Sequence, residues 1–327
     1  MDVRFITSAG AESCDPSELP DLLTRTDGLV WVDMPTCDEQ AEETLTTVFG
    51  FHPLAVRDSA NRNHVPKIHR YDDHLFLVLH APQAGAGGHV HYVELDQFIS
   101  EHYLVTVHGP LNPAVDEAAA RIEVDTILGR LTTGKLKPNN AFELSSAIVN
   151  ALTARLRSYT AELTKDVWKL EQRVTAGHLG DPESFLDEMF RARHGLLTVS
   201  TMAALSNAVY GRMVTIAAFG PGDGQALLKD TVDQFHHLSV MAETQKSYLQ
   251  GTIEFYQART NTKMTIAAER LAVIAAVTLP ITALSSVLGV NLIVNPETRW
   301  PLLAVMLVVM LAMSATLLVW AKRKGWF

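Results

Sequence analysis

Charge is scarce in this chain of 327 residues, and basic charge is scarcer than acidic charge. Charged side chains make up 19% of the residues, below the ~25% of an average soluble protein. With 47% hydrophobic residues, this composition excludes a disordered chain. The net charge of −9 argues against a nucleic-acid-binding protein, which is usually basic. The two cysteines, Cys14 and Cys37, have no partner motif around them and suit a reducing cytosol.

Common catalytic motifs are also missing. There is no Gly-rich phosphate loop, no Gly-x-Ser-x-Gly and no His-Glu-x-x-His. The sequence therefore predicts that the protein is not an enzyme and that it needs no ATP hydrolysis. The N-terminal segment MDVRFITSAG lacks the apolar core of a signal peptide, so we expect the large hydrophilic portion to be cytoplasmic.

Two runs near the C-terminal end, residues 271–296 and 301–321, contain no charged residue. Each is long enough to cross the ~30 Å core of a bilayer, which needs about 20 helical residues. Arg259, Lys263 and Arg270 precede the first run, and the basic segment 322–324 follows the second. Because basic residues beside a span mark the cytoplasmic side, we expect a multi-pass protein of the cytoplasmic (inner) membrane with both termini in the cytoplasm.

The rest of the chain divides into two regions that differ in their pattern of apolar residues and in the secondary structure this pattern predicts. Residues 1–135 read as an α/β cytosolic domain, with strands expected at 29–33, 74–80, 92–99 and 103–108 and helices at 39–49 and 112–131. Residues 136–270 read as a region of long stalk helices, expected at 139–176, 183–219 and about 225–290. Residues 271–327 form the predicted transmembrane domain. The predicted fold class is thus an α/β domain, long stalk helices and two C-terminal transmembrane helices.

The first span carries a stripe of small and hydroxyl-bearing residues. Thr278, Thr282, Ser285 and Gly289 are spaced by four, three and four positions, so they lie on one helical face. Such a stripe among Ala, Val, Leu and Ile fits a wetted face, or alternatively close helix packing. Two spans per chain cannot enclose a pathway, so a conduit requires a cyclic homo-oligomer.

Several short motifs lie within this span, after it, and far upstream in the N-terminal part of the chain. They are Pro280-Ile281-Thr282, Gly289-Val290-Asn291, Asn295-Pro296-Glu297, the basic-aromatic end 322–327, and upstream Phe51-His52-Pro53-Leu54, Asp58, Pro66-Lys67 and Tyr71. In this order the chain resembles the CorA family of divalent metal channels and transporters over most of its length. Val290 stands where the magnesium channels have methionine, and Gly-Val-Asn is typical of the ZntB zinc-transporting branch. The segment Asn295-Pro296-Glu297 is more similar to the magnesium channels.

The resemblance implies a funnel-shaped homopentamer in the lipid bilayer. It implies a selectivity filter at Gly289, Val290 and Asn291, where a ring of neutral Asn carbonyls would accept hydrogen bonds from a hydrated ion. The remaining site residues that it implies are apolar pore constrictions at Leu271 and Leu279, a cation-concentrating Glu297 in the outer loop, and an intersubunit regulatory metal site at Asp58 and Asp230, to which Asp233 could add a ligand.

The function predicted first is passive uptake of Mg²⁺, with Co²⁺ or Ni²⁺ as further cargo, through the oligomeric pore. The alternative is a Zn²⁺ transporter of the ZntB type that could be coupled to protons. A weaker alternative is a membrane-anchored metal sensor. No cofactor is expected beyond a transported or regulatory divalent cation. The thirteen histidines are scattered and define no site. The pair His236-His237 is interpreted as a surface pair on the stalk, and the alternative is that one of the two joins Asp230 and Asp233 in a line of ligands that would suit zinc better than magnesium.

Overall fold

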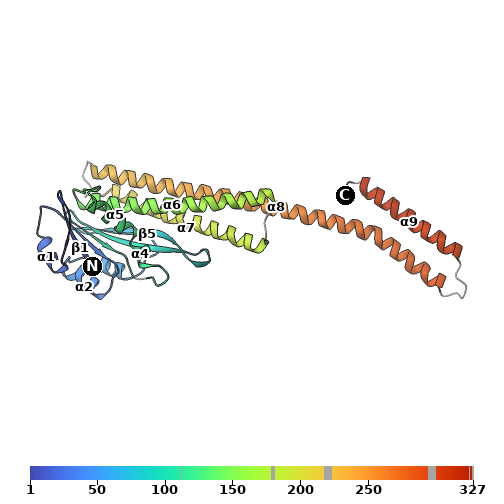
Figure 1. Cartoon of the computed structure of the whole chain (residues 1–327), viewed down its shortest axis with the longest axis horizontal. Helices are drawn as coiled ribbons and strands as arrows, with labels where there is room; N and C mark the ends of the chain where they lie inside the picture. Colours follow the sequence, from blue (N-terminus) through green and yellow to red (C-terminus); the bar gives the residue numbers. More distant parts are fainter. Residues whose placement is uncertain (111, 178–180, 217–222, 294–299, 324, 326–327) are drawn as a thin grey trace. The chain divides into compact units, whose positions relative to one another are not determined.

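The computed structural model describes residues 1–110, 112–177, 181–216, 223–293, 300–323 and 325 (Figure 1). It contains two compact units, Met1–Thr252 and Ile253–Phe327. The three-part division at residues 135 and 270 stays a prediction.

A seven-stranded sheet forms the centre of the first unit. The strand order is β2-β1-β3-β7-β6-β5-β4, and β3 and β7 are parallel whereas the other neighbours are antiparallel. The strands are β1 (Asp2–Thr7), β2 (Gly10–Cys14), β3 (Leu29–Met34), β4 (Lys67–Arg70), β5 (Leu75–Ala84), β6 (Val90–Ile99) and β7 (Tyr103–Val107). The four expected strands are confirmed as β3, β5, β6 and β7. Three short strands, β1, β2 and β4, were not predicted from the sequence.

One face of the sheet is covered by the short helices of the N-terminal part. These are η1 (Pro16–Glu18), α1 (Leu19–Leu22), α2 (Glu39–Thr47) and α3 (Pro53–Ala60). Alternate residues of the central strands point into this layer, among them Val30, Phe76 and Phe98. Since side chains alternate along a strand, the intervening residues face the other layer, and this explains why β3 and most of β5 are buried on both faces.

The motif Phe51-His52-Pro53 starts α3. The Phe51 ring stacks on Phe98 at 4.2 Å between centroids, and the His52 imidazole accepts a hydrogen bond from the Leu54 backbone N–H at 3.2 Å. Pro53 occupies the first helical turn, where its missing N–H is not needed. Tyr71 stacks on His52 at 5.0 Å. The residues that carry the resemblance in this part of the chain therefore anchor α3 to the sheet.

The opposite face of the sheet packs against long helices. They are α5 (Ile122–Thr132), α6 (Ala141–Ala176) and α7 (Pro182–Val214), and Figure 1 shows them along the sheet. Ser145 on α6 donates a hydrogen bond to the Gln97 side chain of β6 at 2.5 Å, which fixes this contact. Between β5 and β6 lies the short helical turn η2 (Ala86–Gly88), as the glycine-rich segment predicts.

Two expected helices differ from the structure. The helix expected at 112–131 is split into α4 (Glu117–Ala120) and α5, because Arg121 leaves helical geometry where its guanidinium contacts Asp2 at 2.9 Å and Asp33 at 3.1 Å. The helix expected at 183–219 ends as α7 at Val214, where the Thr215 N–H closes the last turn. Residues 217–219 lie outside the described residues.

The long helix expected near 225–290 is confirmed as α8 (Asp223–Ile293), 71 residues that contribute to both units. Pro280 lies inside this helix. The second span is α9 (Trp300–Arg323), which ends in Lys322 and Arg323. Among the described residues, α8 and α9 are the two helices that are long and apolar enough to cross a membrane.

Candidate functional site

The side chains expected to line a pore lie on exposed positions of α8. Leu271 and Leu279 are each 67% exposed in the single chain, and Thr278, Thr282 and Ser285 are exposed as well. Exposed leucines in a helix without charge need a covering of lipid or of other subunits. The single chain therefore leaves this face available to a partner of either kind.

Two hydroxyl groups on this face of α8 already use their protons in hydrogen bonds to backbone carbonyls. Thr278 Oγ1 donates to the Ile274 carbonyl, and Thr282 Oγ1 donates to the Thr278 carbonyl, both at 2.8 Å. A carbonyl can only accept, so the hydroxyl proton must point back along the helix. Each oxygen then presents its lone pairs outward, and the stripe offers acceptors.

The signature Gly289-Val290-Asn291 is helical in backbone and lies in the last turns of α8. Its side chains, and the whole of Glu297, lie outside the described residues. The assignment of this motif therefore rests on its position in the sequence, where Gly289 follows Ser285 by four residues.

Asp58 lies near the end of α3 and is half-buried. Its carboxylate forms an ion pair with the Lys67 ammonium at 2.6 Å, and the Asn63 side chain donates to the Asp58 carbonyl at 2.8 Å. A metal ion at Asp58 would have to share this carboxylate with Lys67 or displace the lysine. Lys67 belongs to the motifs that carry the family resemblance, but its ion pair with Asp58 was not predicted from the sequence.

A buried carboxyl pair lies beside this ion pair and was missed from the sequence. Glu94 accepts from the backbone N–H of Asn63 at 2.7 Å and from the Asn63 amide at 2.6 Å. Asp96, two residues along the same face of β6, is completely buried. Burial and the charge of Glu94 raise the pKa of Asp96 well above the usual carboxyl value, which favours the protonated form of this side chain. The alternation of β6 predicted a strand but gave no sign that both faces are covered.

The two stalk aspartates lie on exposed positions of α8. Asp230 accepts from the Gln234 amide at 2.6 Å, and the same amide reaches Asn150 on α6 at 3.2 Å. Asp233 is exposed. Over the described residues, no group of three or more His, Cys, Asp or Glu side chains could hold a metal ion within one chain. The site expected at Asp58, Asp230 and Asp233 therefore stays a prediction.

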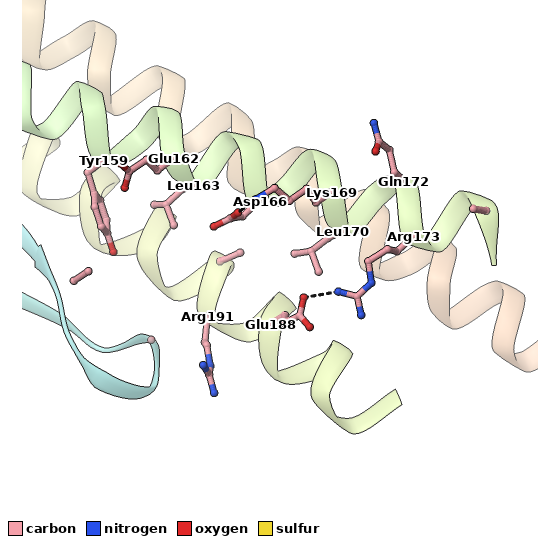
Figure 2. A pocket seen from close by; sticks show the side chains of 14 residues that line it. Tyr159, Glu162, Leu163, Asp166, Lys169, Leu170, Gln172, Arg173, Glu188 and Arg191 are labelled. Carbon is pink, nitrogen blue, oxygen red and sulfur yellow. Dashed lines mark hydrogen bonds and ion pairs between the residues drawn. The ribbon is translucent and has the colours of Figure 1, made fainter. Parts of the chain in front are cut away.

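A groove of about 830 Å³ lies between α6 and α7 at the tip of the β5–β6 hairpin. Figure 2 shows acidic and basic side chains along it, including Glu162, Asp166 and the ion pair of Arg173 with Glu188. The groove contains none of the predicted site residues, and its charges of both signs give it no preference for cations.

The known proteins that this chain resembles include metal transporters. A family model described as CorA-like Mg²⁺ transporter protein matches residues 26–323. YfjQ of Bacillus subtilis (strain 168), whose name assigns it metal ion transport provisionally, is 23% identical over 91% of this chain and 89% of its own length. The cobalt/magnesium transport protein CorA of Thermotoga maritima is 22% identical over 85% of this chain and 77% of its own length.

Two solved structures share the fold. The CorA magnesium transporter from Methanocaldococcus jannaschii superposes with a TM-score of 0.78 at 15% identity, over 100% of this chain and 99% of that chain. The ZntB cytoplasmic domain from Vibrio parahaemolyticus gives a TM-score of 0.59 at 9% identity, over 80% of this chain and 98% of that chain. The fold of the whole chain is therefore shared with a magnesium transporter, and most of it with the ZntB cytoplasmic domain, so the fold does not identify the metal.

The family match and the two helices long and apolar enough to cross a membrane together indicate a membrane transport protein. The chain belongs to the family of CorA-like Mg²⁺ transporters, whose model matches it over nearly the whole length. It is a divalent metal transporter and not an enzyme, as the lack of catalytic motifs predicts. The expected CorA-like fold is confirmed.

Proposed function

We propose that this protein is a homopentameric channel that takes up Mg²⁺, and also Co²⁺ or Ni²⁺, passively across the cytoplasmic membrane. The observation that carries the proposal is the family match over residues 26–323 combined with the acceptor stripe on α8. Both termini would lie in the cytoplasm, because basic residues flank both spans on their outer sides along the chain.

The acceptor stripe suits a hydrated cation. Water molecules around Mg²⁺ turn their oxygens to the ion and their hydrogens outward, and Mg²⁺ gives up this shell reluctantly. Thr278 and Thr282 offer lone pairs to those hydrogens because their own protons are bound to helix carbonyls. The helix face can therefore hold the hydrated ion without stripping it.

The proposed filter follows the same chemistry. A ring of Asn291 side-chain carbonyls would accept from the water shell without the strong attraction of a carboxylate ring, so the ion could leave again. Gly289 would let the backbone of neighbouring subunits approach the axis. Leu271 and Leu279 would form apolar rings that close the pore by dewetting.

The membrane potential is sufficient to drive uptake. Moving one charge is worth ~2.3 kcal/mol per 100 mV, so a divalent cation gains about 4.6 kcal/mol per 100 mV on entering a negative cell. No nucleotide site is therefore needed, in agreement with the absence of a phosphate-binding loop from the sequence.

The test compares two threonines in the same local geometry. Thr282 on α8 and Thr316 on α9 are both exposed, and each donates its hydroxyl proton four residues back at 2.8 Å. Thr282→Ala should slow Mg²⁺ uptake into proteoliposomes at least about 2-fold, because the variant removes this hydroxyl from all five proposed subunits and each hydrogen bond lost to the water shell is worth about 0.5–1.5 kcal/mol. Thr316→Ala should leave uptake unchanged, since α9 would face lipid. Equal rates for both variants and the wild type would show that this face of α8 is not wetted.

The second candidate is a Zn²⁺ transporter, and Val290 in place of methionine is the observation that favours it. Uptake of Mg²⁺ and Zn²⁺ measured with and without a proton gradient separates the two. Zn²⁺ uptake that requires the gradient, with no Mg²⁺ uptake, would replace our proposal. A sensor that is only anchored in the membrane is disfavoured, because the chain belongs to a transporter family and an anchor needs no polar stripe.

A further inference from the structure

The hairpin that joins β5 to β6 carries two histidines on the same face. His89 directly precedes β6, His91 is its second residue, and the intervening Val90 is buried. Because side chains alternate along a strand, His89 and His91 point away from the side on which Val90 is buried. Their rings lie 4.6 Å apart between centroids, with an angle of 77° between the ring planes.

This separation is within the range that two imidazoles on a shared metal ion adopt, and it is also usual for two aromatic rings in contact. With metal–nitrogen bonds of about 2.0–2.1 Å and a ligand angle between about 90° and 110°, the ring centroids come to about 4.5–5.2 Å apart. The angle between the planes places no restriction, because each ring can turn about its own metal–nitrogen bond. The measured separation falls inside this interval without any movement of the backbone.

The hairpin holds the pair in place through its backbone. The Gly85 N–H donates to the His89 carbonyl at 2.8 Å, and the His89 N–H donates to Ala86 at 3.1 Å. Gly85 also makes room for one of the rings, because a Cβ at this position would come within 2.5 Å of His91 Nε2. The backbone of Gly85 has φ −115°, which any residue can adopt, so glycine is needed there for the ring and not for the turn.

Two guanidinium groups that contact the hairpin are each paired with a carboxylate. Arg155 of α6 donates to the side chain of Gln83, the cross-strand partner of His91, and forms an ion pair with Glu123. Arg191 of α7 packs against Gly88 of the hairpin, and its guanidinium forms an ion pair with Asp187. The positive charge nearest to the hairpin on this helix is thus compensated by its own partner.

We propose that His89 and His91 form a binding site for a borderline transition-metal cation such as Zn²⁺, Ni²⁺ or Co²⁺. Imidazole nitrogen suits these ions, whereas Mg²⁺ requires oxygen ligands. The chain supplies two ligands, and water completes the coordination. The site is separate from the proposed pore and does not depend on the proposed function. It would let the cytosolic domain distinguish transition metals from Mg²⁺.

The experiment is carbethoxylation of the full-length protein in detergent with diethyl pyrocarbonate, read out for each histidine by peptide mass spectrometry. Zn²⁺ at ten times its dissociation constant should slow modification of His89 and His91 about tenfold, because only about one site in eleven stays free. Millimolar Mg²⁺ should have no effect. The exposed His69 and the adjacent pair His236 and His237, whose side chains diverge around the helix, serve as internal controls.

Two variants distinguish chelation from two independent contacts. His89→Ala should abolish the Zn²⁺ protection of His91, and Gly85→Ala, which keeps both histidines, should weaken it by displacing the His91 ring. Undiminished protection of His91 in His89→Ala would overturn the proposal. Equal protection by Mg²⁺, equal protection of His69, or no protection at all would overturn it too. Thermal unfolding of both variants should match the wild type, since the hairpin tip is exposed.

Discussion

Removing Arg155 should strongly destabilise the first unit, Met1–Thr252. This guanidinium lies on α6 and is only 11% exposed, and it forms an ion pair at 3.2 Å with Glu123 of α5, which is 3% exposed. It also donates to the Pro82 carbonyl at 3.2 Å, the Gln83 side chain at 2.8 Å and the Ala119 carbonyl at 2.8 Å. Arg155 thus joins α6 to β5, α4 and α5 at one point.

The magnitude follows from the charge that is left behind. In Arg155→Ala, Glu123 stays buried without a cationic partner, and this costs about 3–5 kcal/mol. In a unit of roughly 250 residues, each kcal/mol lowers the melting temperature by about 2–4 °C. We therefore expect the melting temperature to fall by about 6–20 °C.

Cys37 provides the assay. Burial raises the pKa of this thiol to about 12, so it does not react with a thiol-specific fluorogenic dye until the unit unfolds. The full-length protein is heated in detergent micelles in a Cys14→Ser background, so that the dye reports Cys37 alone. Lys169→Ala is the control on the same helix, because its ion pair with Asp166 is exposed and should leave the melting temperature unchanged.

A double variant tests the cause. Arg155→Met combined with Glu123→Gln removes both charges and should melt above Arg155→Ala, because no buried charge is left unpaired. The reasoning would be refuted if Arg155→Ala melted within 2 °C of the wild type, or if the double variant melted below the single one.

Four further outcomes are expected. Asn291→Ala should abolish Mg²⁺ transport or its selectivity in proteoliposomes while the oligomer stays assembled by size-exclusion chromatography; unchanged uptake would contradict the filter. Leu271→Ser should leak Mg²⁺ at high internal Mg²⁺ in the same vesicles, and a closed state as tight as that of the wild type would argue against a gate there. In the double variant Asp58→Ala and Asp230→Ala, millimolar Mg²⁺ should no longer protect the oligomer from protease, whereas protection equal to that of the wild type would exclude regulation at these residues. Asp96 has a raised pKa, so its stabilising contribution is present at low pH and is lost as the pH rises above the ordinary carboxyl range; the melting temperature of Asp96→Asn relative to the wild type should therefore increase from pH 5 to pH 8, and a constant difference would speak against a bound proton.

The sequence predicted best what depends on local pattern. The period of the apolar residues gave α6 and α8 to within a few residues, and the uncharged runs gave the two apolar helices. Phe51, His52 and Pro53 could be quoted as a motif without knowing that they stack, cap and start α3.

What the sequence could not give depends on contacts between distant segments. The break at Arg121 arises from carboxylates about 90 and 120 positions away, on β3 and β1. The ion pair of Lys67 with Asp58 and the raised pKa of Asp96 require α3, β4 and β6 to be assembled first. Likewise, His89 and His91 were two among thirteen histidines until the hairpin set their rings side by side.

The committed hydroxyl protons of Thr278 and Thr282 have a consequence for anions. An anion in contact with this face of α8 would need hydrogen-bond donors, and these two hydroxyls have none to offer. On this face of the proposed pore, the sign of the permeant ion would thus be chosen by the orientation of neutral dipoles, in addition to the fixed charge of Glu297 expected in the outer loop. A hydrogen bond between these oxygens and the water shell of the ion acts at contact distance, within the Debye length of about 3 Å in molar salt, so salt screens it little. The preference for cations over chloride should therefore persist from low to molar ionic strength.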